Sequence, residues 1–221
     1  MLAIPMVGSL VDDFVVPNGF QELISYIDKQ MQANGQVNVL IAGSSCSGKT
    51  TLANFLEKYY AENYQVAQIN QDNYFKNLKD MVRSIEGFYM PDSLFSFHYM
   101  EYREDVQKLL DEGQVLIPEY DVSINHRIPK NHLVVRGQLN IFEGLHTIRI
   151  LDDLPNCIKV FVDTDEAICL ERKIQRDMEK YHVSKMRIIA KWEDMVLPMY
   201  HRFVKQQKSQ ADIVIKTKKG E

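Results

Sequence analysis

The chain has 221 residues, of which 45% are apolar and 25% are charged, and it carries a net charge of −4. This composition is typical of a globular protein of one domain, or one domain with an appendage, and it excludes a wholly disordered, collagen-like or coiled-coil chain. The acidic balance also argues against a nucleic-acid-binding protein, which usually carries a basic surplus.

The sequence gives no sign of a membrane or secreted protein. It contains no run of about 18 apolar residues, the length that a membrane span needs. The N-terminus lacks a basic leader and carries Asp12 and Asp13, so we do not interpret it as a signal peptide. Cys46, Cys157 and Cys169 show no paired metal spacing and fit reduced thiols. We therefore expect a cytoplasmic protein that binds neither membrane nor nucleic acid.

The predicted elements alternate between helices and short apolar strands. In chain order, the sequence predicts a helix over 20–33, a strand over 37–42, a helix over 50–62, a strand over 64–70, a helix from 99 to before Gly113, strands around 141–142 and 158–162, a helix around 188–199 and a strand over 212–216. Pro198 is expected to kink or start the last helix. This alternation favours a mostly parallel sheet with helices on both faces. In such sheets, ligands bind beyond the carboxyl ends of the strands.

A phosphate-binding motif follows the first predicted strand and opens the next helix. The motif G-x-x-x-x-G-K-[ST] is matched by Gly43, Ser44, Ser45, Cys46, Ser47, Gly48, Lys49 and Thr50. Glycines let successive backbone N–H groups point at phosphate oxygens, and the helix adds its positive end. We expect Lys49 to reach the β- and γ-phosphates and the Thr50 hydroxyl to hold Mg²⁺. Cys46 would be a strained choice if the loop requires positive φ there.

A phosphate-binding loop alone serves switch GTPases, motors and small-molecule kinases. The sequence contains neither D-x-x-G nor N-K-x-D, the motifs expected of a switch GTPase, and its charge does not suit a motor on nucleic acid. Of the three functions, phosphoryl transfer to a small molecule is the one that remains. Asp72 follows the second predicted strand, where a carboxylate could accept a hydroxyl proton and help to position Mg²⁺. From its position alone, Asp72 could equally be the N-cap of the next helix.

One later helix carries apolar and cationic residues at a spacing of four. The apolar set is Leu170, Ile174 and Met178, and the cationic set is Arg172, Arg176 and Lys180. An offset of two residues places the two sets on opposite faces. We expect the apolar face to pack. The cations could close over a transferring phosphoryl group, although the spacing alone favours a solvated basic face.

These motifs together resemble the uridine kinase and phosphoribulokinase family of P-loop kinases. From Gly43 to about Val214, the matching segments in family order are G-S-S-C-S-G-K-T-T, N-Q-D-N-Y-F, I-P-E-Y-D, F-E-G, V-F-V-D-T-D, R-K-I-Q-R-D and A-D-I-V-I. The resemblance implies a three-layer α/β fold with a mostly parallel five-stranded sheet, helices on both faces and a helical lid. It also implies transfer of the ATP γ-phosphate to a small-molecule hydroxyl, with ATP and Mg²⁺ required.

The resemblance assigns roles to individual residues. It makes Asp72 the general base and a metal-site residue, and it makes Arg172 and Arg176 lid cations that act with Lys49 on the transferred group. Thr51 and Lys173 join the nucleotide site, although Lys173 replaces a family arginine and loses its bidentate fork. Glu143 is expected near Mg²⁺, with Asp163 as the rival. We expect residues 1–35 to form an extension with one helix, 36–217 the kinase domain with a lid at about 168–190, and 218–221 a tail.

The acceptor side departs from the family. Our candidate acceptor-binding residues are Tyr74, Asp92, Tyr120, Asp121 and Arg127, and an N-cap is the alternative role for Asp92. Tyr89 and Met90 stand where the family's ribose-binding D-H-P-D stretch has Asp and His. The expected acceptor is a nucleoside or a related compound.

Other interpretations stay open. Nicotinamide riboside, pantothenate or a sugar phosphate anchored by Arg127 and Lys130 are further acceptors to consider. A regulatory nucleotide-binding module without kinase turnover is an alternative of another class. The sequence does not decide between a monomer and a homo-oligomer.

Overall fold

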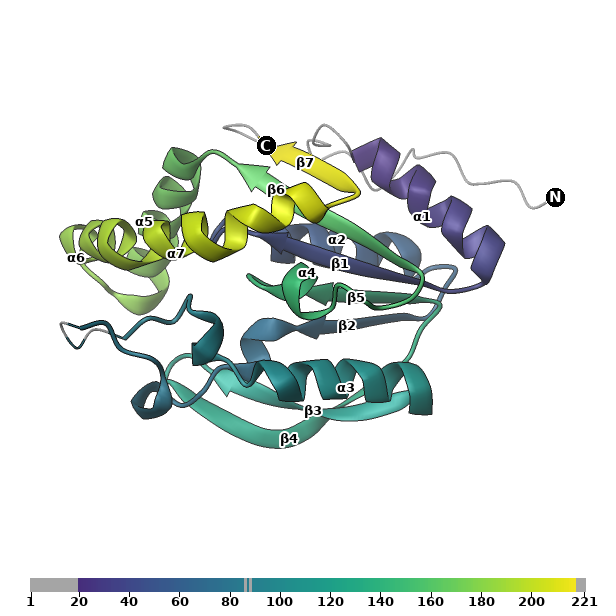
Figure 1. Ribbon diagram of the computed structural model, residues 1–221, viewed down its shortest axis with the longest axis horizontal. Coiled ribbons are helices and arrows are strands. Elements are labelled where there is room, and N and C mark those ends of the chain that lie inside the picture. Colours follow the sequence, from purple (N-terminus) through teal and green to yellow (C-terminus); the bar gives the residue numbers. More distant parts are fainter. Residues whose placement is uncertain (1–19, 86, 88, 218–221) are drawn as a thin grey trace.

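The computed structural model describes residues 20–85, 87 and 89–217, and their core is a five-stranded parallel sheet (Figure 1). The strands lie in the order β2-β5-β1-β6-β7. Their bounds are β1 Val37–Gly43, β2 Val66–Asn70, β5 Leu139–Glu143, β6 Cys157–Thr164 and β7 Ile213–Thr217. All the pairings within this sheet are parallel. The prediction of a parallel five-stranded sheet is therefore confirmed.

The central strand β1 is buried along its whole length, as expected for a strand that is covered on both faces. It pairs with β5 on one side and β6 on the other. The chain order of the strands changes direction at this point, which is where ligands bind in open α/β sheets. The sheet topology therefore directs attention to the loop that follows β1.

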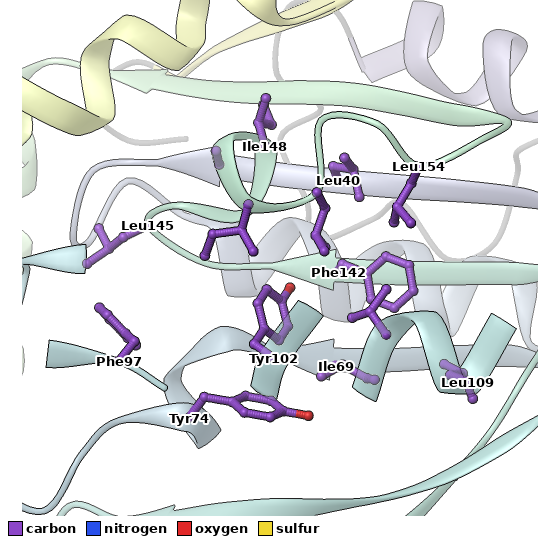
Figure 2. Close-up of a cluster of buried hydrophobic side chains, with 14 of the residues drawn as sticks. Leu40, Ile69, Tyr74, Phe97, Tyr102, Leu109, Phe142, Leu145, Ile148 and Leu154 are labelled. Atoms are coloured by element: carbon purple, nitrogen blue, oxygen red, sulfur yellow. The ribbon is translucent and has the colours of Figure 1, made fainter. Parts of the chain in front are cut away.

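Two apolar layers sandwich the sheet. Against one face pack α1 (Phe20–Asn34) and α2 (Lys49–Tyr60), which join alternate residues of β1 such as Val39 and Ile41 in one buried cluster. Against the other face pack α3 (Tyr99–Glu112) and α4 (Thr147–Ile150), together with Leu40. Figure 2 shows this second cluster, in which Ile69 and Phe142 of the sheet lie near Tyr102 and Leu109 of α3. The three-layer arrangement expected from the resemblance is present.

The helix predicted in the N-terminal region belongs to the core. Leu23 and Ile27 of α1 are fully buried, and Phe20 contacts Phe55 of α2 in an edge-to-face arrangement. Residues 1–19 of the expected extension and the tail at 218–221 lie outside the described residues. Among the residues that are described, no helix is long and apolar enough to span a membrane.

A second sheet, which the sequence patterns did not predict, stands apart from the first. It is an antiparallel hairpin of β3 (Gln114–Asp121) and β4 (His126–Val135). Prolines at 118 and 129 interrupt both apolar runs, and a proline in a run usually argues against a strand. The hairpin tolerates them because these two strands pair only with each other in the described part of the chain.

The last helical stretch winds irregularly around Pro198. It comprises α6 (Lys185–Lys191), wide π-type turns at Trp192–Val196 and Tyr200–Val204 on either side of α7 (Leu197–Met199), and a final 3₁₀ turn at Lys205–Gln210. Proline removes a helical hydrogen bond and crowds the preceding turn, and wider turns accommodate both effects. The predicted disturbance at Pro198 is confirmed.

Candidate active site

The loop after β1 has the backbone that a phosphate cradle requires. A Cβ atom on Gly43 would lie 2.6 Å from the Val162 carbonyl oxygen, so only glycine allows β1 to approach β6 here. Gly48 precedes α2 with a left-handed φ of 104°, a conformation that glycine adopts without strain. Cys46 also has a positive φ, of 60°. Cys46 therefore adopts the positive φ at which a residue with a side chain is strained.

Polar side chains of the loop point inward. Lys49 Nζ donates a 2.8 Å hydrogen bond to the Ser44 carbonyl, and the lysine is 9% exposed. The Ser47 hydroxyl is buried without a hydrogen-bond partner in the described residues. Buried polar groups in native proteins normally have partners. An orphaned hydroxyl beside a folded-back lysine thus fits a loop that completes its hydrogen bonds with a ligand.

Glu143 and Thr50 meet at the carboxyl end of β5. The Thr50 hydroxyl donates to Glu143 Oε1 at 2.9 Å, and the Asn70 side-chain amide donates to the same oxygen at 2.6 Å. Burial raises the pKa of Glu143 to about 7; the charge of Asp72 adds to this rise, while Lys49 and the Thr50 hydrogen bond oppose it. A hydroxyl and a carboxylate in contact are oxygen ligands of the kind that suit Mg²⁺ beside nucleotide phosphates. The donor set therefore fits the ion.

Asp163, the rival carboxylate, is engaged elsewhere. It is the next-to-last residue of β6 and accepts a 2.7 Å hydrogen bond from Lys208 Nζ. The next helix, α5 (Glu166–Tyr181), is capped by Asp165, whose carboxylate accepts a hydrogen bond from the Ala167 backbone N–H. Of the two candidate metal-site carboxylates, Glu143 is the one that contacts Thr50.

Asp72 lies in the 3₁₀ turn that follows β2, and it does not cap that turn. The capping residue is Asn70, whose side-chain oxygen accepts the Asp72 backbone N–H at 2.7 Å. The Asp72 side chain is reachable from solvent. The protein packed around it nevertheless raises its pKa by desolvation, while the charges of Lys49 and Arg176 lower it. Asp72 therefore lies near both cations, with a carboxylate that capping does not use.

Asp92 lies close to Asp72. Desolvation raises the pKa of Asp92, Lys173 lowers it, and the charge of Asp72 raises it further. The 3₁₀ turn that follows is preceded by Ser93, so Asp92 is not its N-cap. The Asp92 carbonyl oxygen lies 2.9 Å from Nε2 of His146, a fully buried histidine whose pKa burial lowers to about 4. His146 is thus a neutral core residue that fixes the Asp92 segment.

Helix α5 brings cations to the phosphate loop. Figure 1 shows α5 beyond the carboxyl ends of the strands. Arg172 Nη1 donates to the Ser47 carbonyl at 3.5 Å. Lys173 and Arg176 both pair with Asp177, with N–O distances of 2.9 and 2.8 Å. Arg172 and Arg176 therefore lie beside the loop, with Asp177 pairing with Arg176 and Lys173, whereas Lys180 lies over the Tyr181 ring.

The expected packing of α5 is confirmed only in part, since Leu170 packs against the cluster of Cys169, Trp192 and Val196. We expected the face of Leu170, Ile174 and Met178 to be buried, yet Met178 is 44% exposed, and the buried side chains are Cys169 and Asp177. Arg172 and Lys173 are half-buried and bind the Ser47 carbonyl and Asp177, while Arg176 and Lys180 are exposed. A prediction from the spacing of apolar residues alone does not take account of such partners for buried charges.

The candidate acceptor residues separate into two groups. Tyr120 and Arg127 are opposite one another in the hairpin, and the Tyr120 hydroxyl and Arg127 Nε are both buried without a partner in the described residues. Asp121 instead accepts hydrogen bonds from Ser123 in the hairpin turn. Tyr74 is fully buried and donates its hydroxyl to Asp105 at 3.0 Å. The structure does not bring Tyr74 to the site, because its hydroxyl is hydrogen-bonded to Asp105 in the core.

The proposed anchors of a sugar phosphate are already neutralised. Arg127 pairs with Glu101 at 2.6 Å, and Lys130 pairs with both Glu101 and Asp105. Sequence reasoning missed these carboxylates, since they come from α3 rather than from the hairpin. It also missed Asn70, whose signal is its place at the end of β2, next to Glu143 in the sheet register.

A phosphate-binding loop at the switch point of a parallel sheet, with carboxylates and cations beyond the strand ends, defines a P-loop kinase. The sequence model of the Phosphoribulokinase / Uridine kinase family matches residues 39–220. The chain belongs to this family, and the family resemblance seen in the motifs is confirmed.

Relatives and solved structures agree with this placement. The chain is 31% identical over 188 residues to a uridine kinase of Ureaplasma urealyticum, covering 84% of this chain and 90% of the relative. It is 32% identical over 185 residues to a uridine kinase of Mycoplasma genitalium, covering 80% and 83%. Phosphoribulokinase from Rhodobacter spheroides shares the fold, with a TM-score of 0.56, 16% identity, and coverage of 82% and 70%. The protein is thus an ATP-dependent kinase of the uridine kinase type, a phosphotransferase that acts on a hydroxyl group.

Proposed function

We propose that the loop from Gly43 to Thr51 binds MgATP and that Asp72 deprotonates the hydroxyl of a small-molecule acceptor. Lys49 and Lys173 would contact the phosphates, and Thr50 and Glu143 would hold Mg²⁺. The single observation that carries the proposal is the convergence of Lys49, Asp72 and Arg176, seen in the effects of both cations on the pKa of Asp72.

The residues divide the chemistry between them. The bound nucleotide supplies the γ-phosphoryl group. Asp72 takes the proton of the acceptor hydroxyl as the new O–P bond forms and the bond between the γ-phosphorus and the bridging oxygen breaks. Arg172 and Arg176 neutralise the charge that spreads over the transferred oxygens. Desolvation raises the pKa of Asp72, which favours proton uptake, and the charges of Lys49 and Arg176 limit that rise.

On the acceptor side, we propose Asp92, Tyr120 and Arg127 as binding residues. Asp92 is supported by its closeness to Asp72, and Tyr120 and Arg127 by their orphaned polar atoms. Uridine is the acceptor that the names of the relatives suggest. Tyr89, however, offers no carboxylate to a ribose diol, and its hydroxyl accepts a hydrogen bond from Arg83, which also stacks on its ring at 4.0 Å.

We also place the kinase in the cytoplasm, where ATP is available. The three cysteines are free thiols, which suits a reducing compartment.

The experiment is an assay of acceptor-dependent ADP release. Purified protein with MgATP is tested against nucleosides, vitamins and sugar derivatives, and at least one hydroxyl compound should raise ADP release well above the rate with water. Asp72→Asn should keep the ATP affinity and lower turnover by about 10²-fold or more. Asp80→Asn, an exposed carboxylate in a nearby turn, is the matched control and should stay active.

Two outcomes would contradict the proposal. Full activity of Asp72→Asn would remove this residue as the base. ATP binding without turnover on every compound would instead support a regulatory nucleotide-binding module.

A further inference from the structure

A pocket of about 120 Å³ lies between the segment Tyr89–Asp92 and the helical stretch from α5 to α7. Most of its wall is apolar and comes from Met90, Val183, Ile188, Met195, Val196 and Met199. Pockets that enclose whole drug-sized ligands measure about 300–1,000 Å³. This pocket therefore accommodates only one apolar part of a molecule.

Residues next to the phosphoryl-transfer site form part of the pocket wall. Asp92 and Lys173 line it. The charge of Asp72 acts on Asp92, and so do those of Lys49 and Arg176. A molecule whose apolar part fills this pocket can therefore present a hydroxyl to Asp72 without leaving the pocket.

A cation without a carboxylate partner among the described residues also lines the pocket. Lys191, an exposed residue at the end of α6, lines it. Arg187 lies one helical turn earlier. Within the described part of the chain, no carboxylate pairs with either residue. Lys173 differs, because Asp177 already neutralises it at 2.9 Å.

The surroundings of Lys191 favour an added negative charge. Burial lowers the pKa of Lys191, and the positive charges of Arg187 and Lys173 lower it further; Asp177 alone opposes them. A bound anion would relieve this repulsion. In contrast, Arg127 and Lys130, the cations that the sequence suggested as anchors, already have Glu101 and Asp105 as partners.

We propose that the acceptor of this kinase is an alcohol with a short apolar part and an anionic group, a carboxylate or a phosphate, which Lys191 binds with Arg187 beside it. This inference rests on the proposed kinase function and narrows its acceptor. The apolar part fills the pocket, the hydroxyl reaches Asp72, and the anion reaches the mouth at Lys191. A neutral nucleoside such as uridine leaves the cations unpaired.

The expected preference follows from the strength of a charged hydrogen bond. Such a bond contributes about 1.5–3 kcal/mol, which corresponds to roughly 10- to 100-fold in affinity. Loss of Lys191 should therefore raise KM for the acceptor by about that factor. The KM for ATP should not change, since Lys191 makes no hydrogen bond or ion pair with the phosphate loop in the described part of the chain.

The test uses acceptors matched in pairs that differ in the anionic group: pantothenate with pantothenol, glycerate with glycerol, and ribose 5-phosphate with ribose. Uridine serves as a neutral reference. For at least one pair, ADP release should show a kcat/KM about 10-fold or more higher for the anionic member, and the pairs separate a carboxylate from a phosphate requirement. Lys191→Gln should abolish this preference, Lys191→Arg should keep most of it, and Lys185→Gln, at the exposed start of α6, should leave it unchanged.

The failures of the two proposals can be told apart. Equal or better turnover of the neutral members, or an unchanged preference in Lys191→Gln, overturns the anionic acceptor while the kinase assignment stands. If no compound gives ADP release, the kinase proposal fails, and calorimetric titration of the same pairs then decides this inference. Binding of an anionic member that Lys191→Gln abolishes supports it, and absence of such binding overturns it.

Discussion

At the scale of single residues, Glu143 is a buried carboxyl group that accepts hydrogen bonds at the proposed metal site. It is 1% exposed, and its Oε1 accepts hydrogen bonds from Thr50 and Asn70. Its pKa rises from an ordinary 4.5 to about 7. A carboxyl whose pKa is raised by folding contributes its full stability below pH 4.5. That contribution is lost as the pH rises through 7, because the folded state then carries a desolvated charge.

We therefore predict that Glu143→Gln stabilises the nucleotide-free protein in a pH-dependent manner. At pH 8 the variant should gain up to about 3 kcal/mol in free energy of unfolding, and at pH 4.5 it should differ little from the native protein. Urea denaturation at the two pH values measures this difference.

Comparison with the native protein at each pH is necessary, because His146 acts in the opposite direction. Its pKa is lowered to about 4, so its contribution is lost as the pH falls. An equal effect of Glu143→Gln at both pH values would contradict the assignment of the raised pKa.

At the scale of elements, Asp105 ties three parts of the fold together. It projects from α3, is 3% exposed, and accepts hydrogen bonds from Tyr74 in the turn after β2 and from Lys130 in β4. Tyr74 is two residues from Asp72. The same buried carboxylate therefore holds both the hairpin and the turn that carries the proposed base.

Removing this carboxylate should destabilise the protein strongly. We predict that Asp105→Ala lowers the free energy of unfolding by about 3–5 kcal/mol, since it leaves a lysine and a buried hydroxyl without their acceptor. Asp111→Ala, on the exposed side of the same helix, should cost less than about 0.5 kcal/mol. Chemical denaturation of both variants tests the difference, and similar losses would mean that the Asp105 network contributes little.

The elements show where sequence patterns succeed and where they do not. The buried strands β1 and β6 were predictable, because apolar runs bounded by loops suffice to define them. The hairpin was not, since Pro118 and Pro129 interrupt its strands and its stability comes from contacts with α3. The buried position of Asp177 in α5 was not predictable either, because its partners Lys173 and Arg176 are known only from the folded chain.

At the scale of the whole molecule, nucleotide binding should stabilise the fold through the loop that connects β1 with α2. At a ligand concentration of about 100 times Kd, binding adds roughly 2.7 kcal/mol, or about 5–10 °C in Tm for a chain of this size. Lys49→Ala should lose this shift.

Lys58→Ala, at the exposed end of α2, is the matched control and should retain the shift. Thermal unfolding with and without MgATP measures it. A shift that persists in Lys49→Ala would place the nucleotide outside the loop.

The site as a whole was partly predictable. The motif identified the phosphate loop, because its glycines and lysine act through local backbone geometry. The partners of its residues were not predictable. Asn70 reaches Glu143 only through the register of β2 with β5. Tyr74 was misassigned because its position in the sequence does not reveal that its hydroxyl bonds to Asp105. Lys191 is far from the motif in sequence and joins the pocket only through the packing of α6.

The order of the strands also separates fast from slow steps in folding. In the main sheet, β1 pairs with β5 through Val37 and Leu139, so a long chain segment must close before this contact forms. The β3–β4 hairpin needs only the closure of a short turn, a process of about 1–10 μs. Distant parallel pairings form more slowly. During refolding, the hairpin and the adjacent helix α3, on which its stability depends, should therefore form before the main sheet.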